Sequence, residues 1–146
     1  MIAPDVNILL YAFREESNRH NEYRSWLAGV LIGEEPVALF EPVLAAVLRI
    51  ATHPAIYRTP APREVVEKYI AALQAAPAAI LLRAGERHWN LFIDLCRRAD
   101  CRGNMVQDAY LAALALEYGC AWITSDRDFA RFAQLIWRHP LDHPTD

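Results

Sequence analysis

Three aspartates, Asp5, Asp108 and Asp126, occur beside apolar segments instead of on a charged surface. Asp5 follows a short apolar segment, Asp126 follows another at residues 121–124, and Asp128 lies two residues later. We expect Asp108 in the first turn of a helix whose remaining residues are almost all apolar. Carboxylates packed close together repel one another and raise each other's pKa values, whereas a divalent cation relieves that repulsion. Since Mg²⁺ and Mn²⁺ prefer carboxylate oxygens, these residues indicate a metal site.

Each aspartate also has an ordinary structural explanation. An Asp that follows a strand often forms a turn or caps a helix, and an Asp in the first turn of a helix complements the helix dipole. The three together carry more information, because the carboxyl ends of parallel strands meet at one edge of a sheet. We therefore expect Asp5 and Asp126 at the same edge, with Asp108 facing it if its helix begins there.

Short apolar strands and helices alternate along the chain. Strands are expected at residues 1–6, 37–40, 79–82, 121–124 and 135–137. Helical spacing of apolar residues predicts helices that include residues 8–13, 23–31, 42–50, 65–73, 89–96, 105–118 and 127–132. Connections of this length between strands predict a parallel sheet covered by helices on both faces, which is the α/β class.

Polar and glycine residues mark where several of these helices begin or end. Ser17 or Asn18 is expected to cap the second predicted helix, because short polar side chains bind free backbone N–H groups there. Asn104 is expected to cap the sixth predicted helix in the same way. Gly119 is expected to end that helix, since glycine adopts the left-handed conformation common at helix ends.

The length and composition favour one folded unit. A chain of 146 residues can bury a substantial core, so we expect a single domain over residues 1–146. A composition of 54% hydrophobic and 23% charged residues excludes a disordered chain. The N-terminal apolar stretch is too short to cross a membrane and has no basic leader, so we expect a cytoplasmic protein without membrane contact. The net charge of −3 becomes +1 once four metal-bound acids are set aside, which lets a phosphate backbone approach.

Three stretches, in order, resemble the motifs of PIN-domain nucleases, and most closely those of the VapC toxins of bacterial type II toxin–antitoxin systems. They read IAPDVNILLYA at residues 2–12, GNMVQDAYLAALA at residues 103–115 and TSDRDF at residues 124–129. The resemblance covers nearly the whole chain and extends to RF at 131–132 and WRHPL at 137–141. Each motif alone has modest specificity, whereas three in order at suitable spacing are specific.

The resemblance implies a fold, an activity and partners. The fold is a three-layer α/β/α sandwich with a central, mostly parallel sheet, and the activity is that of an RNA endonuclease using Mg²⁺ or Mn²⁺. By this match, Asp5, Asp108 and Asp126 are the first, third and fourth metal-binding acids, and Asp128 is the family's trailing acid. The resemblance also implies a homodimer and a cognate antitoxin that blocks the acidic groove.

Other polar residues within the motifs are candidates for supporting roles. Asn7 and Asn104 are expected to orient ligands or bind water, although a turn residue and a helix cap explain them equally well. Thr124 and Ser125 are expected to donate hydrogen bonds to Asp126 and so to orient its carboxylate.

The sequence departs from the family pattern at the second acid. The family places this acid within a helix near the stretch VLAAVLR at residues 43–49, where this chain has Ala46 at the expected position. Glu41 is the only acid between Glu35 and Glu64, and we expect it to replace the missing carboxylate from the start of the helix. The alternative explanation for Glu41 is a favourable charge at a helix N-terminus.

The expected reaction is hydrolysis of an RNA phosphodiester by metal-activated water, which requires no His, Lys or Ser nucleophile. Two other functions remain open. A phosphatase of the haloacid dehalogenase type needs an Asp-x-Asp pair and usually a lysine, whereas this chain has Asn7 in the second position and only Lys68. A degenerate, non-catalytic binding subunit on the same fold would explain Ala46.

Overall fold

The computed structural model describes residues 1–142 and has a central sheet of five parallel strands. The strands are β1 (Ile2–Pro4), β2 (Val37–Phe40), β3 (Ala79–Leu82), β4 (Ala121–Ile123) and β5 (Trp137–Arg138). The α-helices are α1 (Val6–Phe13), α2 (His20–Leu31), α3 (Glu41–Ala51), α4 (Arg63–Ala75), α5 (His88–Arg98) and α6 (Asn104–Tyr118). A short 3₁₀ helix, η1 (Arg127–Arg131), precedes β5.

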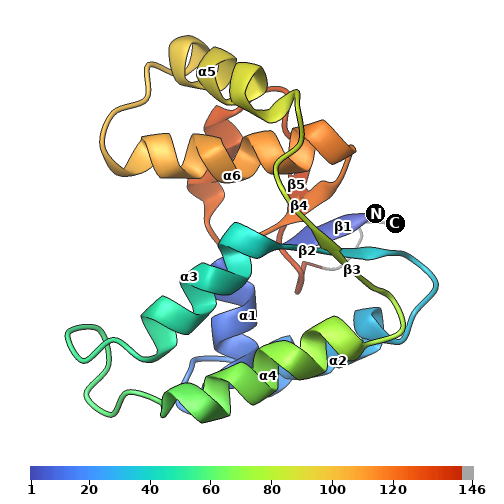
Figure 1. The fold of residues 1–146 in the computed structure, drawn as a ribbon, viewed down its shortest axis with the longest axis vertical. Coiled ribbons are helices and arrows are strands. Elements are labelled where there is room, and N and C mark those ends of the chain that lie inside the picture. Colours follow the sequence, from blue (N-terminus) through green and yellow to red (C-terminus); the bar gives the residue numbers. More distant parts are fainter. Residues whose placement is uncertain (143–146) are drawn as a thin grey trace.

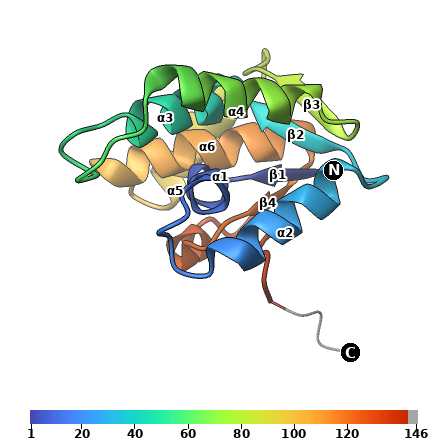
Figure 2. The same ribbon diagram turned by 90° about the horizontal axis from the view of Figure 1, so that it is seen from below.

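Helices cover both faces of the sheet. Helices α1 to α4 lie on one side of the strands, and α5 and α6 lie on the other (Figure 1, and from below in Figure 2). The strand order β3-β2-β1-β4-β5 explains this division. Right-handed crossovers from β1 through β3 place their helices on one face, and the return from β3 to β4 places α5 and α6 on the other. The predicted three-layer α/β/α sandwich is confirmed.

The strand order also positions a binding site. The chain steps away from β1 in one direction to reach β2 and then returns to the other side of β1 to form β4. Ligands bind beyond the carboxyl ends of the strands at such a switch point. Residue Ile2 pairs with Ala121 and Pro4 pairs with Ile123, so the next residues, Asp5 and Thr124, emerge side by side.

The predicted start of α2 is wrong. Neither Ser17 nor Asn18 caps this helix, which begins at His20. The residue before it, Arg19, adopts a left-handed conformation with φ of 59° and makes no side-chain cap. A left-handed conformation is uncommon for residues other than glycine, so residue preferences did not predict this start of the helix.

The predicted start of α6 is also shifted. Gly103 precedes the helix with φ of 57°, so Asn104 is its first residue and not its cap. Asp108 is therefore the fifth helical residue, just past the first turn where it was expected. The predicted end is confirmed, because Gly119 adopts the left-handed conformation with φ of 66°.

Helix α6 packs closely inside the molecule. Its buried residues occupy most of its circumference, as expected for a helix that is apolar nearly all round. Four alanines on it have no exposed surface: Ala109, Ala112, Ala113 and Ala115. Their small side chains allow neighbouring elements to approach closely, and α5 and β4 both contact α6.

None of the helices within residues 1–142 is long and apolar enough to cross a membrane.

A buried glutamate joins α6 to the start of α5. Glu117 is only 9% exposed, and its carboxylate accepts hydrogen bonds from the backbone N–H groups of Gly85 and Arg87 at 2.7 and 2.9 Å. A Cβ atom on Gly85 would lie 2.8 Å from this carboxylate, so glycine allows the close approach. Glu117 therefore fixes the loop that leads from β3 into α5.

We predict that Glu117→Ala lowers the free energy of unfolding by about 2 kcal/mol, because two backbone donors lose a charged acceptor. Urea denaturation measures this change. Glu67→Ala is the control, since Glu67 is an exposed member of an ion pair with Arg63 and should contribute much less. Equal losses in the two variants would contradict the anchoring role of Glu117.

Candidate metal centre

The hydroxyl group of Thr124 connects three segments at the carboxyl edge of the sheet. It donates a hydrogen bond to Asp5 Oδ2 at 2.7 Å. It accepts one from the backbone N–H of Asp126 at 3.0 Å and one from Asn7 Nδ2 at 3.3 Å. The end of β4, the start of α1 and the turn after β4 are therefore joined at one oxygen atom.

Asp5 carries a buried carboxyl group at the centre of this arrangement. Its side chain caps α1 by accepting a hydrogen bond from Val6 N at 2.6 Å, and the residue is 5% exposed. Burial raises the pKa of Asp5 to about 6, although the hydrogen bonds from Thr124 and Val6 favour the charged form. The negative charges of Asp108 and Asp126 raise this pKa further.

The structure brings the other predicted aspartates into the same electrostatic environment. Burial raises the pKa of Asp108, and the charges of Asp126 and Asp128 add to this effect. The carboxylate of Asp126 accepts a hydrogen bond from the backbone N–H of Asp128 at 2.9 Å, which fixes the turn into η1. Asp5 and Asp108 thus both feel the charge of Asp126, although the three residues lie far apart in the sequence.

One cation beside these acids was not identified from the sequence. Arg131 forms an ion pair with Asp128 at 3.5 Å, and its charge lowers the pKa of Asp108 against the effect of burial. Within the described residues, its Nη1 atom is buried without a hydrogen-bond partner. The spacing of Asp128 and Arg131 by three residues was the available signal, because such residues are neighbours on a helix.

Glu41 lies at the same edge of the sheet but has a different partner. It follows β2 directly, and its carboxylate binds Arg83 Nε at 2.6 Å. The Glu41 side chain is 54% exposed and that of Arg83 is 75% exposed, so solvent screens this pair. Ala46, at the position of the missing acid, lies half-buried in the following helix α3.

The supporting residues occupy different surroundings. The hydroxyl of Thr124 does not donate to the Asp126 carboxylate as expected. It donates to the Asp5 carboxylate, and it accepts a hydrogen bond from the backbone N–H of Asp126. Asn7 uses its Nδ2 group on Thr124, and its Oδ1 atom is buried without a partner among the described residues. Ser125 is half-buried beside the aspartates, whereas Asn104 is an exposed residue at the start of α6.

The chemistry of these side chains fits a hard divalent cation. Over residues 1–142, no three His, Cys, Asp or Glu side chains already form a group that could hold a metal ion. The candidate metal ligands at this edge are nevertheless all oxygens, and within residues 1–142 the buried Asn7 Oδ1 has no hydrogen-bond partner. Mutual repulsion among Asp5, Asp108 and Asp126 is the condition that a bound cation relieves.

The sequence matches the PIN domain family over residues 2–135, and the chain belongs to this family. Over 145 residues it is 43% identical to Ribonuclease VapC43 of Mycobacterium tuberculosis, with 99% of each chain covered. The predicted family, the VapC type of PIN domain, is therefore confirmed.

Two solved structures share the fold at low sequence identity. VapBC2 from Rickettsia felis, bound to a DNA fragment from its promoter, matches with a TM-score of 0.71 and 17% identity over 95% of this chain and 98% of that chain. A toxin–antitoxin complex from Klebsiella pneumoniae matches with a TM-score of 0.66 and 17% identity over 98% of this chain and all of that chain. These likenesses agree with the α/β/α sandwich described above.

We predict that ionisation of Asp5 destabilises the metal-free protein. Between about pH 4 and pH 6 the unfolded chain has lost this proton while the folded protein retains it, so the unfolding free energy falls as pH rises. Relative to Asp5→Asn, the wild-type protein should lose about 2 kcal/mol between pH 4 and pH 7, measured by urea denaturation. The control is Asp100→Asn, which removes an exposed carboxylate. Parallel pH profiles for wild type and Asp5→Asn would contradict the raised pKa.

Proposed function

We propose that the chain is a divalent-metal-dependent endoribonuclease that hydrolyses RNA phosphodiester bonds and acts as the toxin of a toxin–antitoxin pair. The observation that carries this proposal is the buried Asp5 carboxyl, which faces the charges of Asp108 and Asp126 at the switch point of the sheet. Acids whose pKa values are raised by burial and by one another are candidates for a functional site. The identity of 43% with a protein named Ribonuclease VapC43 supports the same activity.

The aspartates have distinct roles in this proposal. Asp5, Asp108 and Asp126 would hold Mg²⁺ or Mn²⁺, and Asp128 would bind it directly or through water. When bound there, the ion would lower the pKa of a water molecule and would provide positive charge to stabilise the leaving oxygen. Thr124 holds the Asp5 carboxyl in one orientation, and the Asp128 N–H does the same for Asp126. Arg131 balances part of the local negative charge.

The proposed partners are RNA, a cognate antitoxin and a second copy of the chain. The similar fold from Klebsiella pneumoniae was solved as a toxin–antitoxin complex, which supports an antitoxin partner. The chain also carries large apolar side chains on its surface, and apolar surface is a feature of protein interfaces. Among the described residues, the two most exposed of these are Ile32 and Ile136.

A non-catalytic binding subunit is the second candidate function. It is favoured by Ala46, which provides no carboxylate where the family's second acid is expected. It is also favoured by the ion pair that holds Glu41 on Arg83. Metal-dependent turnover distinguishes this candidate from an active nuclease.

We predict that the purified protein, freed of any partner, cuts total RNA into discrete products in Mg²⁺ or Mn²⁺. EDTA should abolish cleavage, and Asp5→Asn or Asp108→Asn should each lower kcat/KM by about 100-fold or more, because a metal-binding carboxylate is lost. Gel analysis of labelled RNA measures this. A folded wild-type protein that cuts nothing with either metal would overturn the nuclease proposal and favour the binding subunit.

We predict separately that Glu41 contributes to metal binding. Glu41→Gln should raise the Mn²⁺ concentration needed for half-maximal cleavage by about tenfold, because a ligand carboxylate or its close support is lost. Arg83→Gln should not raise it, since Glu41 is then free of its ion-pair partner.

The matched control for this prediction is Glu64→Gln, an exposed acid of α4 that pairs with Arg63. If Glu41→Gln and Glu64→Gln require the same Mn²⁺ concentration, Glu41 is only a surface ion pair at a helix start.

A further inference from the structure

A groove of about 470 Å³ lies beside the proposed metal centre. Three tyrosines, Tyr11, Tyr23 and Tyr57, contribute to its lining, together with Ser125. Ser125 lies between Thr124, which binds Asp5, and the acid Asp126. The groove therefore borders the carboxyl edge of the sheet at Ser125, and its volume is in the range of about 300–1,000 Å³ found for small-ligand sites. We call it the tyrosine groove.

Helix α1 connects the two sites. Asn7 and Tyr11 are four residues apart and so lie on one face of this helix. Asn7 donates to Thr124 in the metal centre, and Tyr11 lines the tyrosine groove. A nucleic acid strand with its phosphate at the acids can therefore place a neighbouring base along this face.

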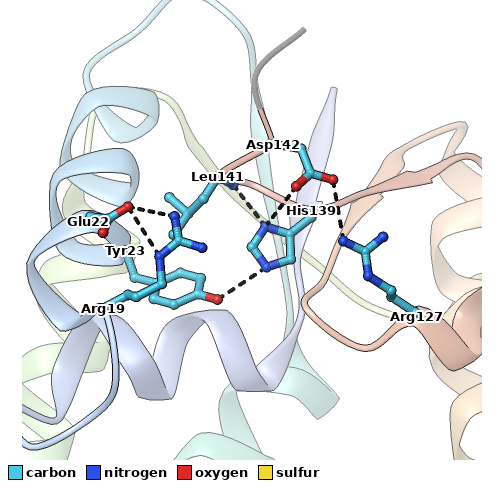
Figure 3. Close-up of polar contacts among 7 residues, drawn as sticks. All are labelled: Arg19, Glu22, Tyr23, Arg127, His139, Leu141 and Asp142. Carbon is cyan, nitrogen blue, oxygen red and sulfur yellow. Dashed lines mark hydrogen bonds and ion pairs between the residues drawn. The ribbon is translucent and has the colours of Figure 1, made fainter. Parts of the chain in front are cut away.

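Contacts with neighbouring side chains hold the three tyrosine rings of the groove in place. The rings of Tyr11 and Tyr23 lie with their centroids 5.1 Å apart. The hydroxyl of Tyr23 lies 3.3 Å from His139 Nε2, which ties α2 to the segment after β5 (Figure 3). The guanidinium of Arg14 lies 3.7 Å from the centre of the Tyr57 ring, and Arg14 also binds the carbonyl of Thr59. The aromatic walls are thus preorganised.

The charges around the groove favour a neutral ligand. Arg19 binds Glu22 at 2.7 Å, as Figure 3 shows, and Arg14 binds Glu16. Among the described residues, each of these two cations is matched by a carboxylate, so the charges beside the groove balance and favour a neutral base over a phosphate group. Polar side chains that can recognise the edge of a base also line it: Ser17, Asn18 and Ser125.

Resting on the proposed function, we propose that the tyrosine groove binds an unstacked base of the RNA substrate next to the phosphodiester that is cut. Proteins that recognise single-stranded RNA stack its bases on aromatic side chains and bind the base edges with polar groups. Tyr11 and Tyr57 are half-buried, so part of each ring remains available to a base. Base-specific contacts here would contribute to the choice of RNA.

The test combines tyrosine variants with RNA that lacks single bases. A short single-stranded RNA containing the mapped cleavage site is made in versions that lack one base at each flanking position. For wild type, loss of the base in the groove should raise KM about tenfold with little change in kcat. Tyr57→Leu or Tyr11→Leu should raise KM similarly for intact RNA, with no further rise when that base is absent.

Two further variants separate the ring from other effects. Tyr57→Phe keeps the aromatic face and should retain most of the affinity. Trp89→Leu removes an exposed aromatic side chain on α5, outside the tyrosine groove, and should leave KM unchanged. If the missing base and Tyr57→Leu have independent effects at every position, or if Trp89→Leu raises KM equally, the groove does not bind a base.

Failure of the nuclease proposal gives a different result. If wild type cuts no RNA in Mg²⁺ or Mn²⁺, the proposed activity is wrong and there is no cleavage site to map. Fluorescence anisotropy of a short labelled single-stranded RNA, made in versions that each lack one base, then tests the groove directly. A weaker Kd for one base-free RNA, absent in Tyr57→Leu, would support the groove. Equal Kd values for all the RNAs would overturn it.

Discussion

The hydrogen bonds of one buried hydroxyl group hold the Asp5 carboxyl beside the segment that carries Asp126. A threonine hydroxyl has one proton to donate and two lone pairs to accept with, and Thr124 uses all three. These bonds fix the Asp5 carboxyl, the Asn7 amide and the backbone of Asp126 relative to each other. The residue is fully buried, so water does not compete for these bonds. The parallel pairing of β1 with β4 is what brings Thr124 beside Asp5.

The same arrangement opposes stability. A carboxyl group that is 5% exposed and has two acidic neighbours is costly to ionise, and its pKa of about 6 records that cost. Functional sites commonly keep such unfavourable groups, and the rest of the fold offsets them. Here the offset comes from the apolar interior, including α6 and the fully buried strand β2.

The sequence predicted most of the fold because its signals are local. Alternating strands and helices, and aspartates at strand ends, identified the parallel sheet and the edge where Asp5 and Asp126 lie. Features that depend on distant contacts escaped prediction. The donation from Thr124 to Asp5 and the pairing of Glu41 with Arg83 both involve neighbours that periodicity does not specify. The tyrosine groove likewise joins side chains from separate segments.

The buried alanines of α6 make the position of Asp108 sensitive to size as well as charge. Ala109 follows Asp108 directly, and Ala112 and Ala113 lie one turn further along, all without exposed surface. An extra methyl group on that face would push the helix outward or slide it along its axis, where each residue spans only about 1.5 Å. The carboxylate would move with it, out of register with Asp5. Larger residues at these alanine positions would thus inactivate a chain of this fold even though every acid remains in its sequence.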